Sequence, residues 1–481
     1  MRLTLLLLLL SLAYFATAQT FTEATNTPFK AVYGSLIAFS DVNGDGHEDV
    51  VITGQDSSNI GFTKLYTNDG AGHFTEKKET PFEDIIGTSI SLSDVNSDGH
   101  EDLLIAGHNG SENIANLYTN DGTGHFTEST GAPFDDNGQR SIAISDVNGD
   151  GHEDVLITAY NIAERIAKLY INDGMGNFTE TTDEPFDLVK TRRVAISDVN
   201  SDGHEDLLIA TRNSSSQPIV KLYINDGTGH FTEMTGTLVE GVIIGSIGFS
   251  DVNGDGHEDV LITGWQGSTW YTAKLFINDG TGHFTERMDT PFEGVFRSSI
   301  AFSDVNDDGH EDVLIAGHNG SESITKLYIN DGSGHFTESM GTPFEGVSSG
   351  SIAFSDVNGD GHEDVLITGE NNSGDPIAKM YINDGVTNST ENLTKRFDLE
   401  LTPYPNPTSS NRVNVSFNSK QLGFVTLNLF DVKGHLLLQQ KEFTGIGKQT
   451  LCIDITSLSV GSYFIQLDAG NRKGTATLVV Q

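Results

Sequence analysis

The sequence predicts an all-β chain in which a seven-bladed β-propeller is followed by a small C-terminal β-sandwich. Three observations support this prediction. The nonapeptide D-V-N-x-D-G-H-E-D occurs seven times, beginning at Asp41, Asp94, Asp146, Asp198, Asp251, Asp304 and Asp356. Short apolar segments separated by Gly- and Asn-rich turns fill each interval, and no helical periodicity interrupts them. The pattern ends near residue 388, where a different series of alternating segments begins.

Each repeat has the pattern of four short antiparallel strands. In the last repeat, residues 351–355 predict a first strand, 365–368 a second and 377–382 a third, with the acidic loop between the first two. In the other repeats an N-D-G-x-G turn leads to a fourth strand, because Gly and Asn-Asp tolerate the positive φ of a tight hairpin. A fixed period with four strands per repeat is typical of propeller blades.

The chain ends favour a closed ring over an open solenoid or a string of separate domains. The seventh repeat loses the pattern after Asn383-Asp384-Gly385 and lacks a fourth strand. The missing strand is found at 21–23, where F-T-E precedes T-P-F at the spacing seen again at 336–344. Closure would remove exposed sheet edges. We therefore expect a propeller over 19–388, a linker over 389–401 and a sandwich over 402–481.

The N-terminus predicts export. Residues 1–18 combine Arg2, an apolar run and an A-T-A site, which together indicate a secretory signal peptide cut after Ala18. The alternative is an uncleaved anchor, but the apolar run is shorter than the ~20 residues that a spanning helix needs. No later segment is apolar enough to cross a membrane. We expect a secreted or outer-surface protein with no transmembrane segment after signal cleavage.

The charge of the chain indicates a demand for cations. There are 68 acidic and 27 basic residues, a net charge of −41, so nucleic acid is excluded as a partner by charge repulsion. Residues 397–481 carry 7 basic and 6 acidic residues, which places the acidic excess in the repeats. Cys452 is the single cysteine, so no internal disulfide can brace the loops of this exported chain.

The nonapeptide has the pattern of a calcium loop. Side-chain oxygens fall at positions 1, 3, 5 and 9, the histidine at position 7 would offer its backbone carbonyl, and the glycine at position 6 permits the sharp turn. Hard oxygen ligands with about three carboxylates suit Ca²⁺, and we expect about seven ions, one per blade. The predicted ligands are Asp41, Asn43, Asp45, His47, Asp49, Asp94, Asn96, Asp98, His100, Asp102, Asp146, Asn148, Asp150, His152, Asp154, Asp198, Asn200, Asp202, His204, Asp206, Asp251, Asn253, Asp255, His257, Asp259, Asp304, Asn306, Asp308, His310, Asp312, Asp356, Asn358, Asp360, His362 and Asp364.

Two alternatives concern the same loops. They could be Asx-rich turns without metal, or the histidines could bind zinc. Zinc needs converging nitrogen or sulfur donors, whereas each loop holds one histidine and the chain has no H-E-x-x-H. We interpret the histidine side chains as solvent-facing, and the glutamate that follows each as an outer neighbour that adds negative charge.

These loops resemble the FG-GAP/VCBS repeat family, the calcium-bearing propeller repeats also found in integrin α-subunits, over residues 19–388. The resemblance implies calcium ligands at the positions named above, and no single activity, since such propellers serve adhesion, glycan binding and occasionally catalysis. The C-terminal segment, with Y-P-N-P at 404–407 and L-N-L-F-D-V-K-G at 427–434, is similar to the sorting domain of type IX secretion in Bacteroidota. That similarity implies the secretion machinery as a partner; an ordinary accessory sandwich is the alternative.

Strand parity divides the repeats into two rims. The acidic loops and N-D-G turns share one rim, and the loops between strands two and three, which vary from repeat to repeat, share the other. Recognition is expected on the variable rim. Trp265, Trp270 and Tyr271 gather there and could stack on a sugar or anchor a protein. We expect a non-catalytic calcium-binding adhesion module for an extracellular glycan or protein, with no catalytic residues. The alternatives are a polysaccharide lyase or hydrolase and a purely structural surface protein.

Overall fold

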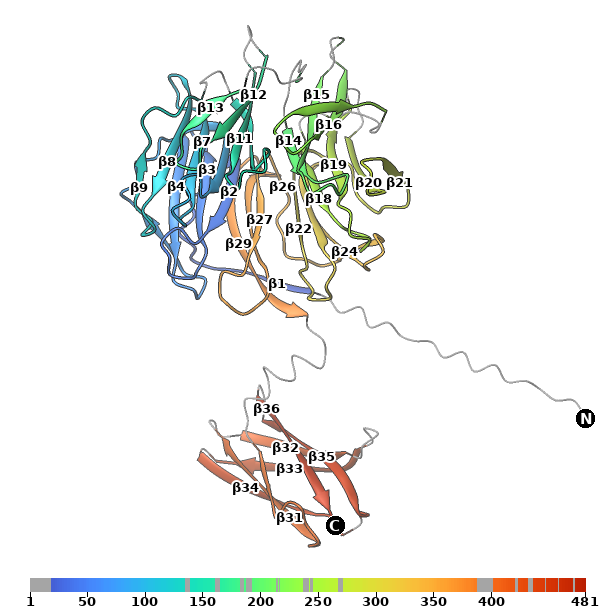
Figure 1. The fold of residues 1–481 in the computed structure, drawn as a ribbon. Coiled ribbons are helices and arrows are strands. Elements are labelled where there is room, and N and C mark those ends of the chain that lie inside the picture. The colour runs from blue at the N-terminus through green and yellow to red at the C-terminus, as the bar shows by residue number, and fades with distance from the viewer. Residues whose placement is uncertain are drawn as a thin grey trace, which may run out of the picture. The chain divides into compact units, whose positions relative to one another are not determined.

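Every regular element that the computed structural model describes is a β-strand (Figure 1). The structure describes residues 19–134, 139–160, 165–181, 186, 193–212, 215, 217–236, 242, 245–266, 271–386, 401–419, 423–430, 436–445, 447–456, 458–469 and 472–481. The expected signal peptide and nearly all of the expected linker lie outside these residues. The chain divides into two compact units, of which one is Gln19–Gly385 and the other includes Val386–Gln481. Across the described residues, no helix has the length and apolar character that a membrane span requires.

Among the described residues of the larger unit, five antiparallel four-stranded sheets have their strands in chain order, and the strands of the last two repeats lie together in one nine-stranded sheet. The first strands are β2 (Tyr33–Ser40), β6 (Ile86–Ser93), β10 (Gln139–Ser145), β14 (Arg193–Ser197), β18 (Ile247–Ser250), β22 (Phe296–Ser303) and β27 (Ile352–Ser355), the last preceded by the short β26 (Val347–Ser348). The second strands are β3 (Asp49–Gln55), β7 (Asp102–His108), β11 (Asp154–Tyr160), β15 (Asp206–Arg212), β19 (Asp259–Trp265), β23 (Asp312–His318) and β28 (Asp364–Asn371).

A third strand follows in every repeat, and an outer fourth strand follows in every repeat but the last. The third strands are β4 (Gly61–Asn68), β8 (Asn113–Asn120), β12 (Arg165–Asn172), β16 (Pro218–Asn225), β20 (Tyr271–Asn278), β24 (Ser323–Asn330) and β29 (Pro376–Val386). The outer strands are β5 (Phe74–Lys77), β9 (Phe126–Glu128), β13 (Phe178–Glu180), β17 (Phe231–Met234), β21 (Phe284–Arg287) and β25 (Phe336–Glu338). Bridges through β26 join the sheets of the last two repeats.

The second strands explain why the sequence has uninterrupted apolar runs such as V-V-I-T. In β3, all residues from Asp49 to Gly54 are buried, whereas a strand with one wet face would alternate. Residues on one face of β3 pack against the next repeat, and those on the other face pack against the last repeat: Val51 shares a cluster with Leu103, and Ile52 shares one with Leu366. Each repeat thus buries both faces of its sheet against its neighbours.

Contacts between neighbouring repeats run around a complete circuit. The first strands lie against one another in the order β2, β6, β10, β14, β18, β22 and β27, and β27 lies against β2. The side chain of the asparagine that opens each N-D-G turn donates a hydrogen bond to the acidic loop of a neighbouring repeat. These bonds, of 2.8–2.9 Å, join Asn120 to the Val42 carbonyl, Asn172 to Val95, Asn225 to Val147, Asn278 to Val199, Asn330 to Val252, Asn383 to Val305, and Asn68 to Val357.

The strand β1 (Gln19–Glu23) pairs with β29, at the sheet edge where the last repeat has no fourth strand of its own. Phe21 is buried and its ring lies 4.9 Å from that of Phe344. Glu23 forms an ion pair with Lys379 at 3.0 Å, as Glu338 does with Lys326 inside the sixth repeat. The N-terminal strand therefore makes the contacts that a fourth strand makes elsewhere.

The strands of the last repeat extend beyond the predicted bounds. The second strand runs from Asp364 to Asn371 and the third from Pro376 to Val386, so the polar stretch expected between them shrinks to a four-residue turn. The reason lies in the ladder, because Glu370 pairs with Pro376. Side-chain composition gave no sign of this pairing.

The smaller unit contains a sheet of β30 (Thr402–Tyr404), β31 (Arg412–Ser419) and β34 (Gly447–Asp454). A second sheet has the order β33 (Leu436–Thr444), β32 (Gly423–Phe430), β35 (Gly461–Ala469) and β36 (Arg472–Val480). Alternate residues of both sheets, among them Val413, Leu427 and Ile465, contribute to a single hydrophobic core. The strand β32 ends at Phe430, inside the L-N-L-F-D-V-K-G segment at 427–434.

The circuit of asparagine bonds yields a matched test of closure. Asn68→Ala and Asn225→Ala remove the same local bonds, but only Asn68 reaches the last repeat. Each substitution leaves a buried carbonyl without its hydrogen-bond donor. Both should therefore lower the free energy of unfolding by about 1–3 kcal/mol in urea titrations. A loss in Asn225→Ala without a comparable loss in Asn68→Ala would contradict closure between the first and last repeats.

Candidate functional site

In each acidic loop, the first aspartate accepts backbone hydrogen bonds that hold the loop in its turn conformation. In the first loop, Asp41 Oδ1 accepts the backbone N–H of Asp45 at 3.1 Å, and Asp41 Oδ2 accepts that of Gly46 at 2.8 Å. Gly46 has φ 85°, a conformation that a residue with a Cβ rarely adopts. Asp45 in turn accepts the N–H of His47 at 3.0 Å. The bonds from the first aspartate recur in the other loops.

The ninth residue of each loop is a buried aspartate that begins the second strand. Asp49 is 1% exposed, and its Oδ1 accepts the backbone N–H of Asn68 at 2.8 Å. The same bond recurs in the other repeats at 2.7–2.8 Å. Asn68 also donates from Nδ2 to Val357, so this carboxylate indirectly anchors the link to the neighbouring loop.

Burial raises the pKa of these ninth-position carboxyl groups, and the nearby first and fifth aspartates of the same loop raise it further. The pKa is raised to about 6 for Asp49, Asp102 and Asp154, to about 7 for Asp206, Asp259 and Asp364, and to about 8 for Asp312. The three carboxylates of each loop are thus close enough for their negative charges to repel one another. A divalent cation among them would favour their ionised forms.

Two features of the loops suit a hard cation: their many oxygen atoms, and two buried oxygen atoms that have no hydrogen-bond partner. The buried amide oxygens of Asn306 and Asn358, both at position 3, have no hydrogen-bond partner. A buried acceptor without a partner is costly, and a cation ligand role would satisfy it. Among the described residues, no three His, Cys, Asp or Glu side chains gather as a metal-binding group. The first and fifth aspartates instead turn oxygens toward backbone N–H groups, and the ligand assignment stays a prediction.

The loop histidines pack against the N-D-G turns. A Cβ on Gly70 would lie 2.3 Å from His47 Cε1, and the equivalent glycine of every other repeat lies against its loop histidine. His47, His100 and His310 are exposed, whereas His152, His204, His257 and His362 are half-buried. The expectation of solvent-facing imidazoles therefore describes three of the seven well. The glycine of N-D-G serves two purposes, because it permits the turn and makes room for the ring.

The glutamates at position 8 make bonds that the sequence analysis missed. Glu48 accepts the hydroxyl of Ser355 at 2.8 Å, and Glu258 accepts that of Ser197 at 2.9 Å. Ser93 contacts Glu153 in the same way. Each of these bonds joins the end of one repeat's first strand to the next repeat's acidic loop.

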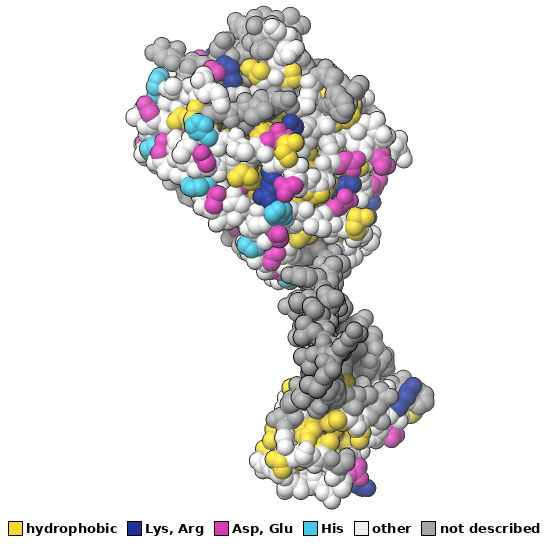
Figure 2. Space-filling model, turned by 90° about the vertical axis from the view of Figure 1, so that its right-hand side faces the viewer, with side chains coloured by type: hydrophobic (Ala, Val, Ile, Leu, Met, Phe, Trp, Pro, Cys, Tyr) yellow, Lys and Arg dark blue, Asp and Glu magenta, His cyan; other side chains and the backbone are white. Residues whose placement is uncertain are grey.

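Five lysines of the third strands are held in ion pairs with the adjacent outer strands. The third-strand lysines reach glutamates of the neighbouring outer strand at 2.8–3.2 Å: Lys168 to Glu180, Lys221 to Glu233, Lys274 to Glu286, Lys326 to Glu338 and Lys379 to Glu23. These lysines are therefore committed away from the acidic loops. On the face in Figure 2, histidine and acidic side chains lie close together.

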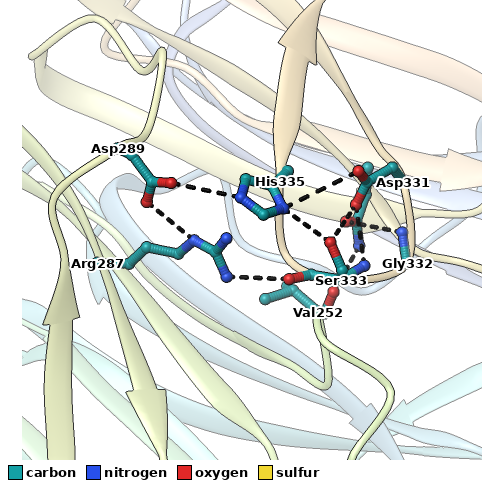
Figure 3. A network of polar contacts seen from close by, with 8 residues as sticks. Val252, Arg287, Asp289, Asp331, Gly332, Ser333 and His335 are labelled. Carbon is teal, nitrogen blue, oxygen red and sulfur yellow. Dashed lines mark hydrogen bonds and ion pairs between the residues drawn. The ribbon is translucent and has the colours of Figure 1, made fainter.

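One further ion-pair network joins the fifth and sixth repeats (Figure 3). Asp289 lies 3.1 Å from Arg287 Nε and 3.4 Å from His335 Nε2. Arg287 also donates to the carbonyl of Ser333, in the N-D-G turn of the sixth repeat, at 2.9 Å. The network therefore joins the fifth and sixth repeats at an N-D-G turn, on the rim that also carries the acidic loops.

The predicted ligand-binding aromatics are partly used in packing. Trp265 and Tyr271 face each other across the hairpin of β19 and β20, and Trp270 lies outside the described residues. The Tyr271 ring is stacked on Phe296 of the next repeat, with centroids 4.5 Å apart. A Cβ on Gly320 would lie 2.6 Å from Tyr271 Cε2. One face of Tyr271 is therefore covered, and Trp265 is half-buried.

Two histidines on the variable rim are held by local backbone bonds. His108 Nδ1 accepts the N–H of Gly110 at 2.9 Å, and His318 Nδ1 accepts that of Gly320 at 2.9 Å. In both copies the following asparagine donates to a glutamate, Asn109 to Glu83 at 2.7 Å and Asn319 to Glu293 at 2.6 Å. These side chains close the loop between strands two and three.

Comparisons with known proteins agree with the loop spacing. The FG-GAP-like repeat family matches residues 41–105, 94–157, 198–262, 251–315 and 304–367. The secretion system C-terminal sorting domain matches residues 402–481. Integrin alpha-4 of Xenopus laevis is 28% identical over 157 residues, which cover 29% of this chain and 15% of that protein. The chain thus spans under a sixth of the length of this relative.

Solved structures with a distant likeness include glycoside hydrolases and the tandem repeat of a large adhesion protein. Fructan 1-exohydrolase IIa from Cichorium intybus has a TM-score of 0.32 at 9% identity, covering 96% of this chain and 92% of that one. A glycosyl hydrolase from Bacteroides ovatus has a TM-score of 0.27 at 13% identity, covering 52% and 85%. At TM-scores this low the likeness assigns neither an activity nor a substrate to this chain.

The matched sorting domain directs the chain to the type IX secretion machinery, and so to the cell surface or the extracellular medium. The loops that fold around their first aspartate, repeated along the larger unit, coincide with the matched repeats. The chain belongs to the FG-GAP-like repeat family and carries a type IX secretion C-terminal sorting domain.

Proposed function

We propose that this secreted chain is a seven-bladed, calcium-loaded β-propeller with a C-terminal β-sandwich, and that it acts as a non-catalytic binding module for an extracellular glycan or protein. The seven-bladed ring is supported by the circuit of first-strand contacts and by the bond from Asn68 to Val357. The sandwich is supported by the single core shared by its two sheets.

Calcium binding is supported by the composition and packing of the acidic loops. The orphaned oxygens of Asn306 and Asn358 and the mutual influence of the three aspartates in each loop favour a cation there. Ca²⁺ accepts six to eight oxygen ligands in flexible geometry, which suits loops that offer side-chain and backbone oxygens. The ions would brace the rim and perform no chemistry on a substrate.

The observation that carries the binding proposal is the contrast between the two rims. On one rim the aspartate bonds recur from repeat to repeat. On the other, six residue types occupy the same place near the end of the seven second strands: Gln55, His108, Tyr160, Arg212, Trp265, His318 and Glu370. Diverse side chains on a rigid scaffold are what recognition of a particular ligand requires.

The alternative enzyme and the purely structural protein have less support. On the variable rim, Nδ1 of His108 and of His318 already accepts a backbone N–H. The nearby Glu83 and Glu293 accept hydrogen bonds from asparagine side chains. These are the groups that a hydrolase or lyase on this rim would draw on for proton transfer. Their local bonds favour a structural part in the loop.

Removal of calcium should destabilise the protein. At a tenfold excess of Ca²⁺ over Kd each site contributes about 1.4 kcal/mol, so seven sites contribute on the order of 10 kcal/mol. Excess EGTA should therefore lower the Tm substantially in a thermal melt, and restored Ca²⁺ should raise it again. Mg²⁺ serves as the control, because it demands a stricter octahedral geometry and should rescue less. An unchanged Tm in EGTA would refute the calcium assignment.

Glycan-array binding tests the proposed recognition rim. Trp265→Ala and Trp270→Ala should abolish binding if the variable rim holds the ligand, because aromatic side chains supply most of the contact energy at such sites. Met175→Ala is the matched control, since Met175 is 78% exposed in an N-D-G turn and its loss should leave binding unchanged. Turnover of a polysaccharide by the wild-type protein would instead favour the enzyme, and inertness in both assays the structural protein.

A further inference from the structure

The acidic loops are not equivalent at position 4. Four loops have glycine there and two have serine, while the sixth has Asp307. All seven residues share a left-handed backbone, with φ between 58° and 73°: Gly44, Ser97, Gly149, Ser201, Gly254, Asp307 and Gly359. The side chain is therefore free to differ while the loop conformation stays the same.

Where position 4 has a side chain, that side chain contacts the histidine of the next loop. Ser97 Oγ lies 3.2 Å from His152 Nδ1, and Ser201 Oγ lies 2.9 Å from His257 Nδ1. Asp307 Oδ2 lies 2.6 Å from His362 Nδ1, a close polar contact that is not aligned as a hydrogen bond. These contacts join the loops in pairs, second with third, fourth with fifth and sixth with seventh. Glycine leaves no such side-chain contact between the seventh and first loops or between the first and second.

The pair formed by the sixth and seventh loops differs from the others in charge and in unsatisfied atoms. Asp307 gives the sixth loop a carboxylate that no other loop has at this position. The orphaned amide oxygens, Asn306 Oδ1 and Asn358 Oδ1, lie one in each of these two loops. Asn383 adds a second link, from the turn of the seventh repeat to the Val305 carbonyl at 2.9 Å.

His362 is held from two sides in this pair. Asp307 approaches its Nδ1, and a Cβ on Gly385 would lie 2.7 Å from its Nε2. The backbone N–H of His362 donates to Asp360 at 3.1 Å, so a fixed ring also fixes the loop around it. His362 is the residue whose carbonyl the sequence predicts as a calcium ligand.

We propose that the sixth and seventh acidic loops form one coupled calcium unit, in which Asp307 of the sixth loop positions His362 of the seventh and the two loops fill at lower calcium than the first loop. The inference rests on the calcium part of the proposed function. The affinity of oxygen-ligand loops rises with the charge of the ligands and with the rigidity of the site. Asp307 is not a predicted ligand, but it adds negative charge beside the ligands of the sixth loop and restrains the His362 ring of the seventh. Because β1 completes the sheet of the seventh repeat, filling this unit also braces the joint between β1 and that repeat.

Hydrogen exchange of the full-length mature protein, followed loop by loop over a calcium series, tests the coupling. Wild type should show protection of residues 304–312 and 356–364 at lower calcium than residues 41–49. Asp307→Ser converts the sixth loop to the sequence of the second and fourth loops, so folding is expected to be preserved. It should raise the calcium midpoint of the seventh loop about twofold to fivefold, the range of an exposed charge contact.

A second pair of variants separates coupling from simple proximity. Asp308→Asn weakens the sixth site and should raise the midpoint of the seventh loop. Asp255→Asn weakens the fifth site, which neighbours the sixth loop but has Gly254 at position 4, and should leave the calcium midpoint of the sixth loop unchanged. Equal seventh-loop midpoints in wild type, Asp307→Ser and Asp308→Asn would overturn the coupling while leaving calcium binding intact. No calcium-dependent protection in any loop would overturn the calcium assignment together with the coupling.

Discussion

The bond that the larger unit depends on is the one between a buried aspartate and the asparagine that ends the third strand. Asp49 accepts the Asn68 backbone N–H, which leaves the Asn68 amide free to reach the Val357 carbonyl of another repeat. The backbone N–H of Gly70 donates to the side-chain oxygen of Asn68 at 3.2 Å. Asn68 therefore links a strand end, a turn and a neighbouring loop. A repeat alone would lack both the donor for its valine carbonyl and an apolar partner for each face of its sheet.

Charge is distributed so that this framework has a surplus of carboxylates on one rim. Lysines such as Lys221 lie 2.8 Å from outer-strand glutamates and are not available to the loops. Of the loop carboxylates, the ninth is buried and the first is occupied by backbone N–H groups. Repulsion among the remaining charges grows with each added loop, because the circuit of contacts fixes them on a common rim. The calcium ions that we propose, one in each loop, would relieve that repulsion where it arises.

The sequence predicted the repeat, the loop and the strand that the last repeat lacks, because each is written in local pattern: a fixed period, an Asx-Gly turn and a second F-T-E. It did not predict the role of Asn68, whose partner is 289 residues away in the chain. Nor did it predict that Tyr271 would stack on Phe296, since that contact depends on how two repeats face each other. The alternation between glycine and other residues at position 4 can be read from the sequence. Only the structure shows that Asp307 contacts His362 of the next loop.

If the variable rim binds the ligand that we propose, the separation of the two rims would let such a chain change its ligand without losing its fold. Near the end of each second strand the backbone ladder is the same whatever the side chain, with Gln55 opposite Gly61 and Trp265 opposite Tyr271. A substitution there leaves the aspartate and asparagine bonds of the other rim untouched. Surface changes away from buried networks usually alter stability by less than about 0.5 kcal/mol, so the rim can be diversified repeat by repeat. Stability is concentrated where the repeats are alike, and recognition can be expected where they differ.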